Sequence, residues 1–460
     1  MPQPSPFVRS LVDAKGLSGW MRSIATVSLA VGLAIGLAAT AAADDWPQWL
    51  GPQRDAIWRE QGIVETLDEQ PRIKWEAEVG GGYAGAAIAD GRVYLMDYQK
   101  SGGTLANNPG GRTQLQGQER VLCLDAASGE TLWMHSYDRP YAISYAVGPR
   151  ATPAVDGDRV YTLGAEGNLK CLSTDDGSVV WEKDLQAAYG VAAPIWGFAA
   201  HPLVDGDLVY TMVGGAGCGV VAWNKTTGEE AWKALDAKDA GYCPPQVIDY
   251  GGRRQLIAWT PTELASLDPA TGEVFWTKPL QPDYGMSIAM PRLAGDRLFA
   301  SGYSKNAVYK LADGQPAAEE QWNSPGMKSL YSSNCTPVID EGLAYGCDIQ
   351  SGTLRAIRLT DGSEVWSSYE PWKGERRRRH ATAFITRIVG QDRFILWTDK
   401  GDLVLCTLDP KGYTELSRTH VLQPTQEAFG KLVLWTPPAY AGRTAFLRND
   451  NKLVAVDLAE

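Results

Sequence analysis

The sequence predicts an all-β fold, an eight-bladed β-propeller built from four-stranded antiparallel blades. Three observations predict it. Glycine accounts for 49 of the 460 residues, which indicates many tight turns. A tryptophan recurs at one place in a repeated unit, and a short turn between two β-patterned runs recurs at another. Both series run to eight positions, and units of about 40–50 residues with four strands each are typical of propellers.

The tryptophan series is the first marker of the repeat. A glycine precedes the tryptophan by four residues in the pairs Gly129/Trp133, Gly177/Trp181, Gly228/Trp232, Gly272/Trp276 and Gly362/Trp366. Trp75 and Trp322 continue the series without that glycine, and Leu416 takes the tryptophan place in the remaining unit. The glycine provides the positive φ of a turn. We expect the tryptophan to fill the wedge-shaped gap between neighbouring units, where its large area is buried.

The second marker is a short hairpin turn that contains Gly or Asp. It lies in the segments 88–94, 155–161, 204–210, 249–257, 293–299, 339–345, 389–395 and 440–446. Turns of this type join adjacent antiparallel strands. Each unit is therefore expected to contain strand A, the hairpin turn, strand B, a loop, strand C, a second turn with the glycine, and strand D with the tryptophan.

The two ends of the repeat region are expected to complete one blade. The last unit has strand A near Leu434–Tyr440, strand B at Thr444–Arg448 and strand C at Lys452–Leu458, but no strand D. The segment around Trp75 is a D-type strand with no A, B or C before it. We expect this strand to close the ring, since closure removes an open sheet edge. Residues 72–460 are therefore predicted to form one domain, although length alone suggests about three.

Residues 1–43 are expected to be a secretory signal peptide. A basic start is followed by an apolar run from Ile24, which ends in three alanines at Ala43. This pattern predicts cleavage before Asp44, with Met21 as an alternative start of the chain. The competing interpretation is an uncleaved membrane anchor, because the run is nearly long enough to span a bilayer. With cleavage, the protein is exported to the periplasm or the extracellular space and keeps no transmembrane segment.

Two segments lie outside the repeat. Residues 44–71 form an N-terminal arm with three tryptophans, and the polar stretch Gln99–Arg120 is an insertion between strands B and C of the first blade. We expect the insertion to be a surface loop. The net charge of −11 argues against a nucleic acid or an anionic membrane as a partner. The protein is expected to be a monomer.

The seven cysteines are not arranged as a disulfide framework. They are Cys123, Cys171, Cys218, Cys243, Cys335, Cys347 and Cys406. The first, second and last occupy one repeat position at which other units have Ala or Ser, so we expect them to be small buried side chains. Each of the pairs Cys218/Cys243 and Cys335/Cys347 could form a disulfide, although the unpaired state is favoured.

The repeats LDAASGETLW and LDPATGEVFW resemble the pyrroloquinoline-quinone (PQQ) repeat of the quinoprotein alcohol dehydrogenase-like superfamily, whose members are eight-bladed propellers. The segments DDWPQWLGPQRD and WGFAAHPLVDGDLVY are similar to exported bacterial PQQ-like propeller proteins, which are likened to the propeller lipoprotein of the outer-membrane β-barrel assembly machinery. The resemblance covers residues 44–460 and implies the fold and an envelope location. The chain lacks three motifs of these relatives, namely adjacent cysteines, Cys-x-x-Cys-His and a lipid-attachment cysteine.

The connections from strand D of one blade to strand A of the next are expected to line one mouth of the ring and to carry function. The aromatic residues in them are Tyr145, Trp196, Tyr242, Tyr284 and Tyr331, and the basic run is Arg376, Arg377, Arg378, Arg379 and His380. The aromatic residues could stack a planar ligand or hold a peptide; alternatively, they pack the blade crossings. The basic run could hold an anion or an acidic partner; alternatively, it is solvated surface.

These features favour an exported, non-catalytic binding or scaffold protein of the cell envelope, which holds a protein, peptide or glycan with the loops at one mouth. The alternative, implied by the superfamily resemblance, is a PQQ-dependent oxidoreductase with PQQ and calcium as cofactors. The missing cysteine pair, haem motif and cofactor-holding insertions favour the first hypothesis. No nucleophile elbow, phosphate loop or metal motif is present, so no catalytic residue or metal ligand is predicted and no cofactor is expected.

Overall fold

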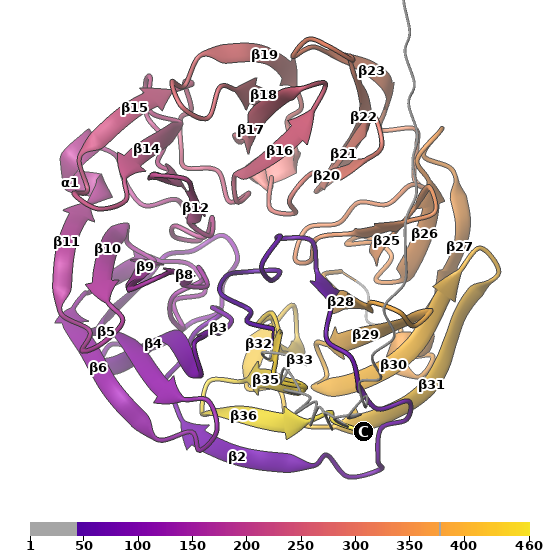
Figure 1. Cartoon of the computed structure of the whole chain (residues 1–460), viewed down its shortest axis with the longest axis horizontal. Coiled ribbons are helices and arrows are strands. Elements are labelled where there is room, and N and C mark those ends of the chain that lie inside the picture. The colour runs from indigo at the N-terminus through magenta and orange to yellow at the C-terminus, as the bar shows by residue number, and fades with distance from the viewer. Residues whose placement is uncertain (1–43, 377–378) are drawn as a thin grey trace, which may run out of the picture. The chain divides into compact units, whose positions relative to one another are not determined.

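The computed structural model of the chain describes residues 44–376 and 379–460. The predicted signal peptide, residues 1–43, and two members of the basic run, Arg377 and Arg378, lie outside this part of the chain. Eight β-sheets are arranged radially around a central axis (Figure 1). Each blade has four strands, A to D from the axis outward, and the sheets of blades 1 and 7 each carry one additional strand. The eight predicted hairpin turns join strands A and B. The predicted eight-bladed propeller is therefore confirmed.

The first four blades follow one another in chain order. Blade 1 contains β3 (Ala87–Ala89), β4 (Arg92–Gly102), β5 (Thr113–Asp125) and β6 (Thr131–Asp138), and β7 (Tyr141–Ile143) pairs with β5. Blade 2 contains β8 (Ala154–Asp156), β9 (Arg159–Leu163), β10 (Asn168–Ser173) and β11 (Val179–Asp184). Blade 3 contains β12 (Leu203–Asp205), β13 (Leu208–Met212), β14 (Val220–Asn224) and β15 (Glu230–Ala234). Blade 4 contains β16 (Gln246–Tyr250), β17 (Arg253–Trp259), β18 (Glu263–Leu267) and β19 (Val274–Pro279).

Blades 5 to 7 continue the same order. Blade 5 contains β20 (Arg292–Ala294), β21 (Arg297–Gly302), β22 (Lys305–Leu311) and β23 (Ala318–Asn323). Blade 6 contains β24 (Val338–Asp340), β25 (Leu343–Cys347), β26 (Leu354–Arg358) and β27 (Glu364–Ser368). Blade 7 contains β28 (Ala383–Ile388), β29 (Arg393–Thr398), β30 (Asp402–Asp409) and β31 (Gly412–His420). Three short helical segments, α1 (Leu185–Tyr189), η1 (Asp283–Gly285) and η2 (Glu370–Trp372), lie in D–A connections.

Blade 8 combines the two ends of the propeller, as predicted. Its strands are β34 (Ala439–Ala441), β35 (Thr444–Arg448), β36 (Lys452–Asp457) and, on the outside, β2 (Ile73–Glu78). The antiparallel register of β2 and β36 runs from Ile73↔Val456 to Glu78↔Lys452. A separate hairpin of β32 (Gln426–Ala428) and β33 (Lys431–Val433) precedes strand A. Strand A begins later than the predicted Leu434, because Pro437 and Pro438 have no N–H to donate to a strand ladder.

The Gly–Trp spacing has a packing explanation. Trp75 of blade 8 lies on the C–D turn of blade 1, where its indole N–H donates to the carbonyl of Ala126 at 2.9 Å. A Cβ added to the turn residue Gly129 would lie 2.5 Å from the Trp75 ring. Trp133 lies in the same way against Gly177, Trp181 against Gly228, Trp232 against Gly272 and Trp322 against Gly362. The predicted filling of the gap between blades by tryptophan is therefore confirmed.

Leu416 replaces the tryptophan at the junction of blades 7 and 8 for a topological reason. Strands C and D of blade 8 come from opposite ends of the propeller, so this blade has no C–D turn on which a tryptophan could pack. The segment before β2 crosses the junction instead, and the backbone N–H of Leu67 donates to Oγ of Ser417 at 2.9 Å. The exception in the repeat thus marks the place where the ring closes.

The insertion Gln99–Arg120 is the expected surface loop only at its tip, residues 103–112. Most of it extends β4 and β5 into a long hairpin, with Gln99 paired to Gln118. Its alternating sequence from Thr113 to Gln116 places Thr113 and Leu115 in buried positions, and β7 pairs with this stretch from its other side. For the remainder of the insertion, the expectation was wrong because a polar composition hid a period-two strand pattern.

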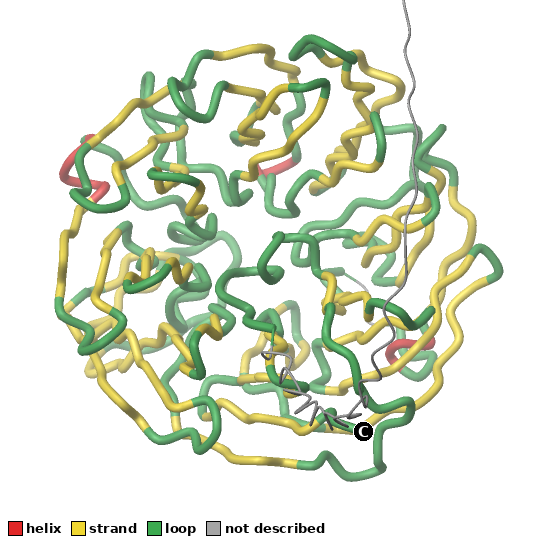
Figure 2. The backbone as a smooth tube through the Cα atoms, in the orientation of Figure 1, coloured by secondary structure: helices red, strands yellow, loops and turns green. Residues whose placement is uncertain are grey.

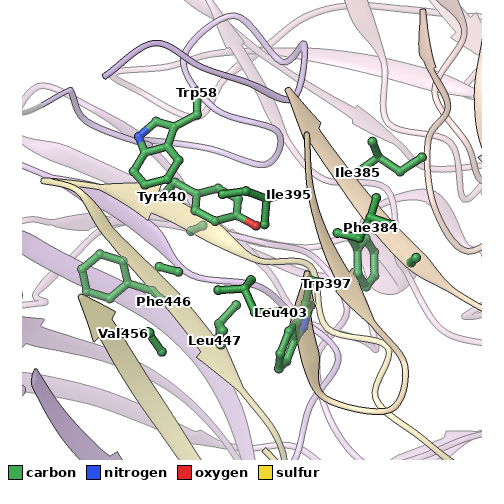
Figure 3. Packing of buried hydrophobic residues seen from close by; sticks show 14 of the residues in the cluster. Trp58, Phe384, Ile385, Ile395, Trp397, Leu403, Tyr440, Phe446, Leu447 and Val456 are labelled. Carbon is green, nitrogen blue, oxygen red and sulfur yellow. The ribbon is translucent and has the colours of Figure 1, made fainter. Parts of the chain in front are cut away.

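The N-terminal arm crosses the end of the ring at which the A–B turns lie, which we call the lower mouth. It is the indigo segment that enters the middle of the ring in Figure 1, and Figure 2 shows that it is mostly loop. Trp46 bridges to Ile88 of blade 1, and β1 (Ile57–Trp58) pairs in parallel with β28 of blade 7. Trp58 stacks on Tyr440 of blade 8 with ring centroids 4.9 Å apart (Figure 3). The arm therefore belongs to the core of the propeller.

Candidate functional site

A cavity of about 600 Å³ lies in the centre of the ring. All eight connections between consecutive blades contribute to its wall at the opposite end, the upper mouth. Ten aromatic side chains line it: Trp49, Tyr83, Tyr145, Trp196, Tyr242, Tyr284, Tyr303, Phe384, Phe429 and Trp435. The cavity falls in the size range of small-molecule sites, about 300–1,000 Å³, which are usually concave and mostly apolar.

The structure brings most of the predicted binding face together. Tyr145, Trp196, Tyr242, Tyr284, Arg379 and His380 line the cavity. Tyr331 does not; it is buried beside Met286 and Ile349, and its hydroxyl donates to the carbonyl of Gly326 at 3.0 Å. Arg376 is exposed and lies over the ring of Tyr369, with 5.5 Å between its guanidinium carbon and the ring centroid. The packing interpretation therefore fits Tyr331, and the remaining tyrosines both pack and face the cavity.

The lower end of the cavity is covered by the N-terminal arm. Trp49 stacks on His201, with ring centroids 4.4 Å apart and planes 13° apart. Nδ1 of His201 accepts a hydrogen bond from the backbone N–H of Thr152 at 2.7 Å. Burial holds the pKa of His201 well below its usual value, with a further contribution from Arg54, so the ring is neutral at pH 7. Sequence reasoning missed this floor because the arm lies outside the repeat.

A continuous row of aromatic rings runs along the upper mouth from blade 5 to blade 8. The ring centroids of Tyr284 and Tyr303 are 5.6 Å apart, those of Tyr303 and His380 6.0 Å, and those of His380 and Phe429 4.5 Å with nearly parallel planes. Phe429 is the tip of the β32–β33 hairpin. Burial, together with Lys431 and Arg379, lowers the pKa of His380 to about 4, so the row is uncharged at neutral pH.

Beside the blade 8 end of this row, the wall contains a polar corner made by Tyr83, Tyr145, Arg150 and Trp435, and the ring centroids of Trp435 and His380 are 6.1 Å apart. The Arg150 guanidinium lies over the Tyr83 ring, 5.2 Å from its centroid, and the Tyr145 and Trp435 rings meet edge to face at 5.9 Å. The hydroxyls of both tyrosines and the indole N–H of Trp435 are buried without a hydrogen-bond partner among the described residues. Burial raises the pKa of Tyr145 to about 12, so its hydroxyl keeps its proton at neutral pH.

The cavity wall carries positive charge. Arg150 and Arg379 line it, whereas none of the lining residues that the structure describes is Asp or Glu. Calcium takes six to eight oxygen ligands, usually with carboxylates among them. In the described ranges, no group of three or more His, Cys, Asp or Glu side chains is placed to hold a metal ion. The cavity therefore does not fit the calcium-bound quinone of the alternative hypothesis.

Several lining residues were missed by sequence reasoning although the signal was present. Tyr83 and Trp435 lie in D–A connections, the same class of segment that pointed to Tyr145. These two connections flank blade 8. Its repeat is split between the two ends of the propeller, so the connections are harder to recognise in the sequence than the others. Phe429 lies in the same connection as Trp435, within the β32–β33 hairpin, which has no counterpart in the other units.

None of the seven cysteines forms a disulfide, and one of them, Cys335, lies in the cavity wall. All seven cysteines are buried and unpaired, and Cys123, Cys171 and Cys406 are fully buried, as expected for small core side chains. In the part of the chain that the structure describes, no helix is long and apolar enough to cross a membrane.

The sequence was compared with known families and proteins. The profile of the family described as Outer membrane protein assembly factor BamB matches residues 117–368. The chain is similar to the outer membrane protein assembly factor BamB of Yersinia pestis, with 22% identity over 278 residues. That match covers 59% of this chain and 66% of the relative, which is just under two thirds of its length.

A solved structure supports the fold. The structure of BamB from Moraxella catarrhalis superposes with a TM-score of 0.53 and 13% identity, covering 83% of this chain and 98% of that one. A quinohemoprotein alcohol dehydrogenase from Comamonas testosteroni covers 90% of this chain and 80% of its own at 12% identity. Its TM-score of 0.44 is too low to support an argument about the site.

Proposed function

This chain belongs to the family described as Outer membrane protein assembly factor BamB, and from that premise we propose that it is an exported, non-catalytic β-propeller of the cell envelope. In this proposal its upper mouth binds a protein partner, as the name of its relatives suggests for an assembly factor. The predicted signal peptide supports export, and its residues lie outside the described part of the chain. A periplasmic location follows if the signal is cleaved.

The aromatic row at the upper mouth is the observation that carries this proposal. The side chains at both ends of the row are exposed, with exposed fractions of 77% for Tyr284 and 45% for Phe429. Met327, in the neighbouring D–A connection, is 87% exposed. Large exposed apolar side chains that cluster on loops mark sites of protein interaction more often than ordinary surface. The exposed Arg376 and Arg379 beside them favour a partner with acidic groups.

Site-specific cross-linking tests the location of the partner. A photoreactive amino acid at position 327 should give a discrete cross-linked product in cell-envelope preparations. The same amino acid at position 158, in an exposed A–B turn at the lower mouth, is the matched control and should give none. Equal products from both positions, or a product from position 158 only, would move the partner site away from the upper mouth.

Charge substitution tests the chemistry of the same contact. Arg379→Ser should weaken capture of the cross-linked partner, and raising the salt concentration should have the same effect, because exposed ionic contacts are screened over about 10 Å at 0.1 M. Thermal unfolding should change little, since surface substitutions usually alter stability by less than about 0.5 kcal/mol. Capture that is independent of salt and of Arg379 would show that the basic run is ordinary surface.

A further inference from the structure

We propose that the central cavity binds a small hydrophobic anion, an aromatic ring system that carries one carboxylate, sulfonate or phosphate group. The cavity lies inside the upper mouth, and the aromatic row belongs both to its wall and to the rim at which a protein partner is proposed to bind. Three properties of the cavity support this ligand class: an apolar body, an end covered by the chain itself, and a donor-rich corner with a cation that makes no salt bridge to a described residue.

The body of the cavity suits planar apolar groups. Aromatic side chains come from the connections of nearly every blade, and Trp49 covers the lower end. Ring-to-ring contacts favour offset-stacked or edge-to-face arrangements, so a cage of rings selects a flat aromatic ligand over a branched aliphatic one. Because Trp49 is held against His201 and the arm crosses the lower mouth, the ligand enters and leaves by the upper mouth.

The cation in the polar corner is Arg150. Its guanidinium donates to the carbonyls of Gly148, Ser144 and Tyr145, at 2.8 Å for Ser144 and 2.6 Å for Tyr145. These carbonyls are uncharged and leave further N–H donors of the guanidinium free. Among the described residues, no carboxylate lies within salt-bridge distance of Arg150. A cation enclosed by protein is costly unless it is paired, so the corner favours an anion.

Three more donors surround this cation. The hydroxyls of Tyr83 and Tyr145 and the indole N–H of Trp435 are buried without a partner in the described part of the chain. A buried donor that makes no hydrogen bond has lost its contact with water without gaining a partner, and native structures contain few of them. All three are donors at neutral pH, and an oxyanion accepts several hydrogen bonds at once. The corner therefore has the composition of an oxyanion site.

The rest of the cavity does not compete for a cation. His201 and His380 are neutral at pH 7, and the lining residues that the structure describes include no Asp or Glu. A positively charged or zwitterionic ligand would meet Arg150 and Arg379 without a compensating acid. A polar uncharged ligand such as a sugar would leave many of its hydroxyls against aromatic rings. A hydrophobic anion matches both the aromatic lining of the cavity and the polar corner around Arg150.

Two fluorescent dyes of matched shape test the proposal. Anilinonaphthalene sulfonate has an aromatic body with a sulfonate, and phenylnaphthylamine has the same body without the charge. The sulfonate dye should bind the full-length folded protein with one site per chain and at least about tenfold more tightly than the neutral dye, because a charged hydrogen bond is worth about 1.5–3 kcal/mol. Near-UV circular dichroism should confirm that the protein keeps its native packing.

Arg150→Met should remove the preference for the sulfonate dye and leave binding of the neutral dye unchanged. Tyr145→Phe keeps the ring and removes only the hydroxyl, so it should weaken the sulfonate dye alone, by a smaller factor. If Arg150→Met does not fold, Tyr145→Phe alone tests the polar corner. The matched control is Arg159→Met, in a lower-mouth turn, which should change neither dye. Equal affinity for both dyes, several weak sites per chain, or wild-type sulfonate binding by Arg150→Met and Tyr145→Phe would overturn the proposal.

Discussion

At the turn between strands C and D, a glycine lies in close contact with a tryptophan from the neighbouring blade. Gly177 has a φ of +70°, and a Cβ at this position would lie 2.5 Å from the Trp133 ring. Gly157, in an A–B turn, has a similar φ of +56° but open space where a Cβ would lie. The two glycines separate the cost of backbone conformation from the cost of lost packing.

Gly177→Ala should therefore destabilise the protein more than Gly157→Ala. Both pay for a left-handed backbone at a residue with a Cβ, about 1–2 kcal/mol. Only Gly177→Ala also displaces a buried tryptophan, which adds a cost in the range of a badly overpacked core, about 1–3 kcal/mol. Equilibrium unfolding in denaturant measures both. Equal losses would show that the glycine is required by its φ alone and that the blade gap adapts.

His380 gives the upper mouth a dependence on pH. Its folded-state pKa, about 4, lies below the unfolded value of about 6.5, since burial and the nearby Lys431 and Arg379 disfavour the charged ring. The unfolded chain therefore binds the proton more readily. The contribution of His380 to stability is present above pH 6.5 and is lost as the pH falls from about 6.5 to 4, by at most about 3 kcal/mol.

The loss of melting temperature between pH 7 and pH 4.5 should be larger in the wild type than in His380→Asn. Asparagine tolerates the left-handed backbone of this residue, whose φ is 59°. His201 is buried in both proteins and contributes equally to their acid sensitivity. A variant with the same acid-induced loss as the wild type would mean that His380 is already exposed to protonation in the folded state.

At the scale of the strand and the turn, periodic features could be predicted and unique ones could not. Strands A to D, the eight hairpin turns and ring closure follow from patterns that recur, so each unit supports the assignment of the others. The β32–β33 hairpin and the arm occur once and have no such support. The candidate site divides in the same way. The tyrosines of the regular connections were predicted, whereas Trp49 and Phe429 belong to the irregular segments.

Ring closure predicts that Trp75 is as important as a tryptophan within the repeat. Trp75 and Trp181 are both 8% exposed, and each donates its indole N–H to a backbone carbonyl of the next blade at 2.9 Å. Trp75→Ala and Trp181→Ala should each cost about 3–5 kcal/mol of unfolding free energy. Leu416→Ala, at the half-exposed equivalent position of blade 7, is the control and should cost much less. If Trp75→Ala lowered the unfolding free energy only slightly, the strand that closes the ring would not be essential for stability.

For the molecule as a whole, the arm connects blades that are not neighbours in the ring. Its contacts reach blade 1 through Trp46, blade 3 through the hydrogen bond from Arg54 to the carbonyl of Pro202, and blade 7 through β1. In return, Arg292 of blade 5 donates to the carbonyls of Arg54 and Asp55. In a propeller closed by one strand alone, loss of that strand separates two blades. Here the arm also links blades 1, 3, 5 and 7 across the lower mouth. We therefore expect the arm, which covers the lower end of the cavity, to unfold together with the blades that it contacts.

This arrangement predicts that the arm stays bound after the chain is cut behind it. Residues 68–70 are exposed and precede β2, so a protease site placed there leaves ring closure by β2 intact. The arm holds three largely buried tryptophans, Trp46, Trp49 and Trp58, each of which contributes roughly 150 Å² or more of contact area. After cleavage, the fragments should elute together in size-exclusion chromatography and separate only in denaturant. If the arm were released while the ring remained folded, the arm would not be part of the core. The segment that covers the lower end of the cavity would then be bound only reversibly.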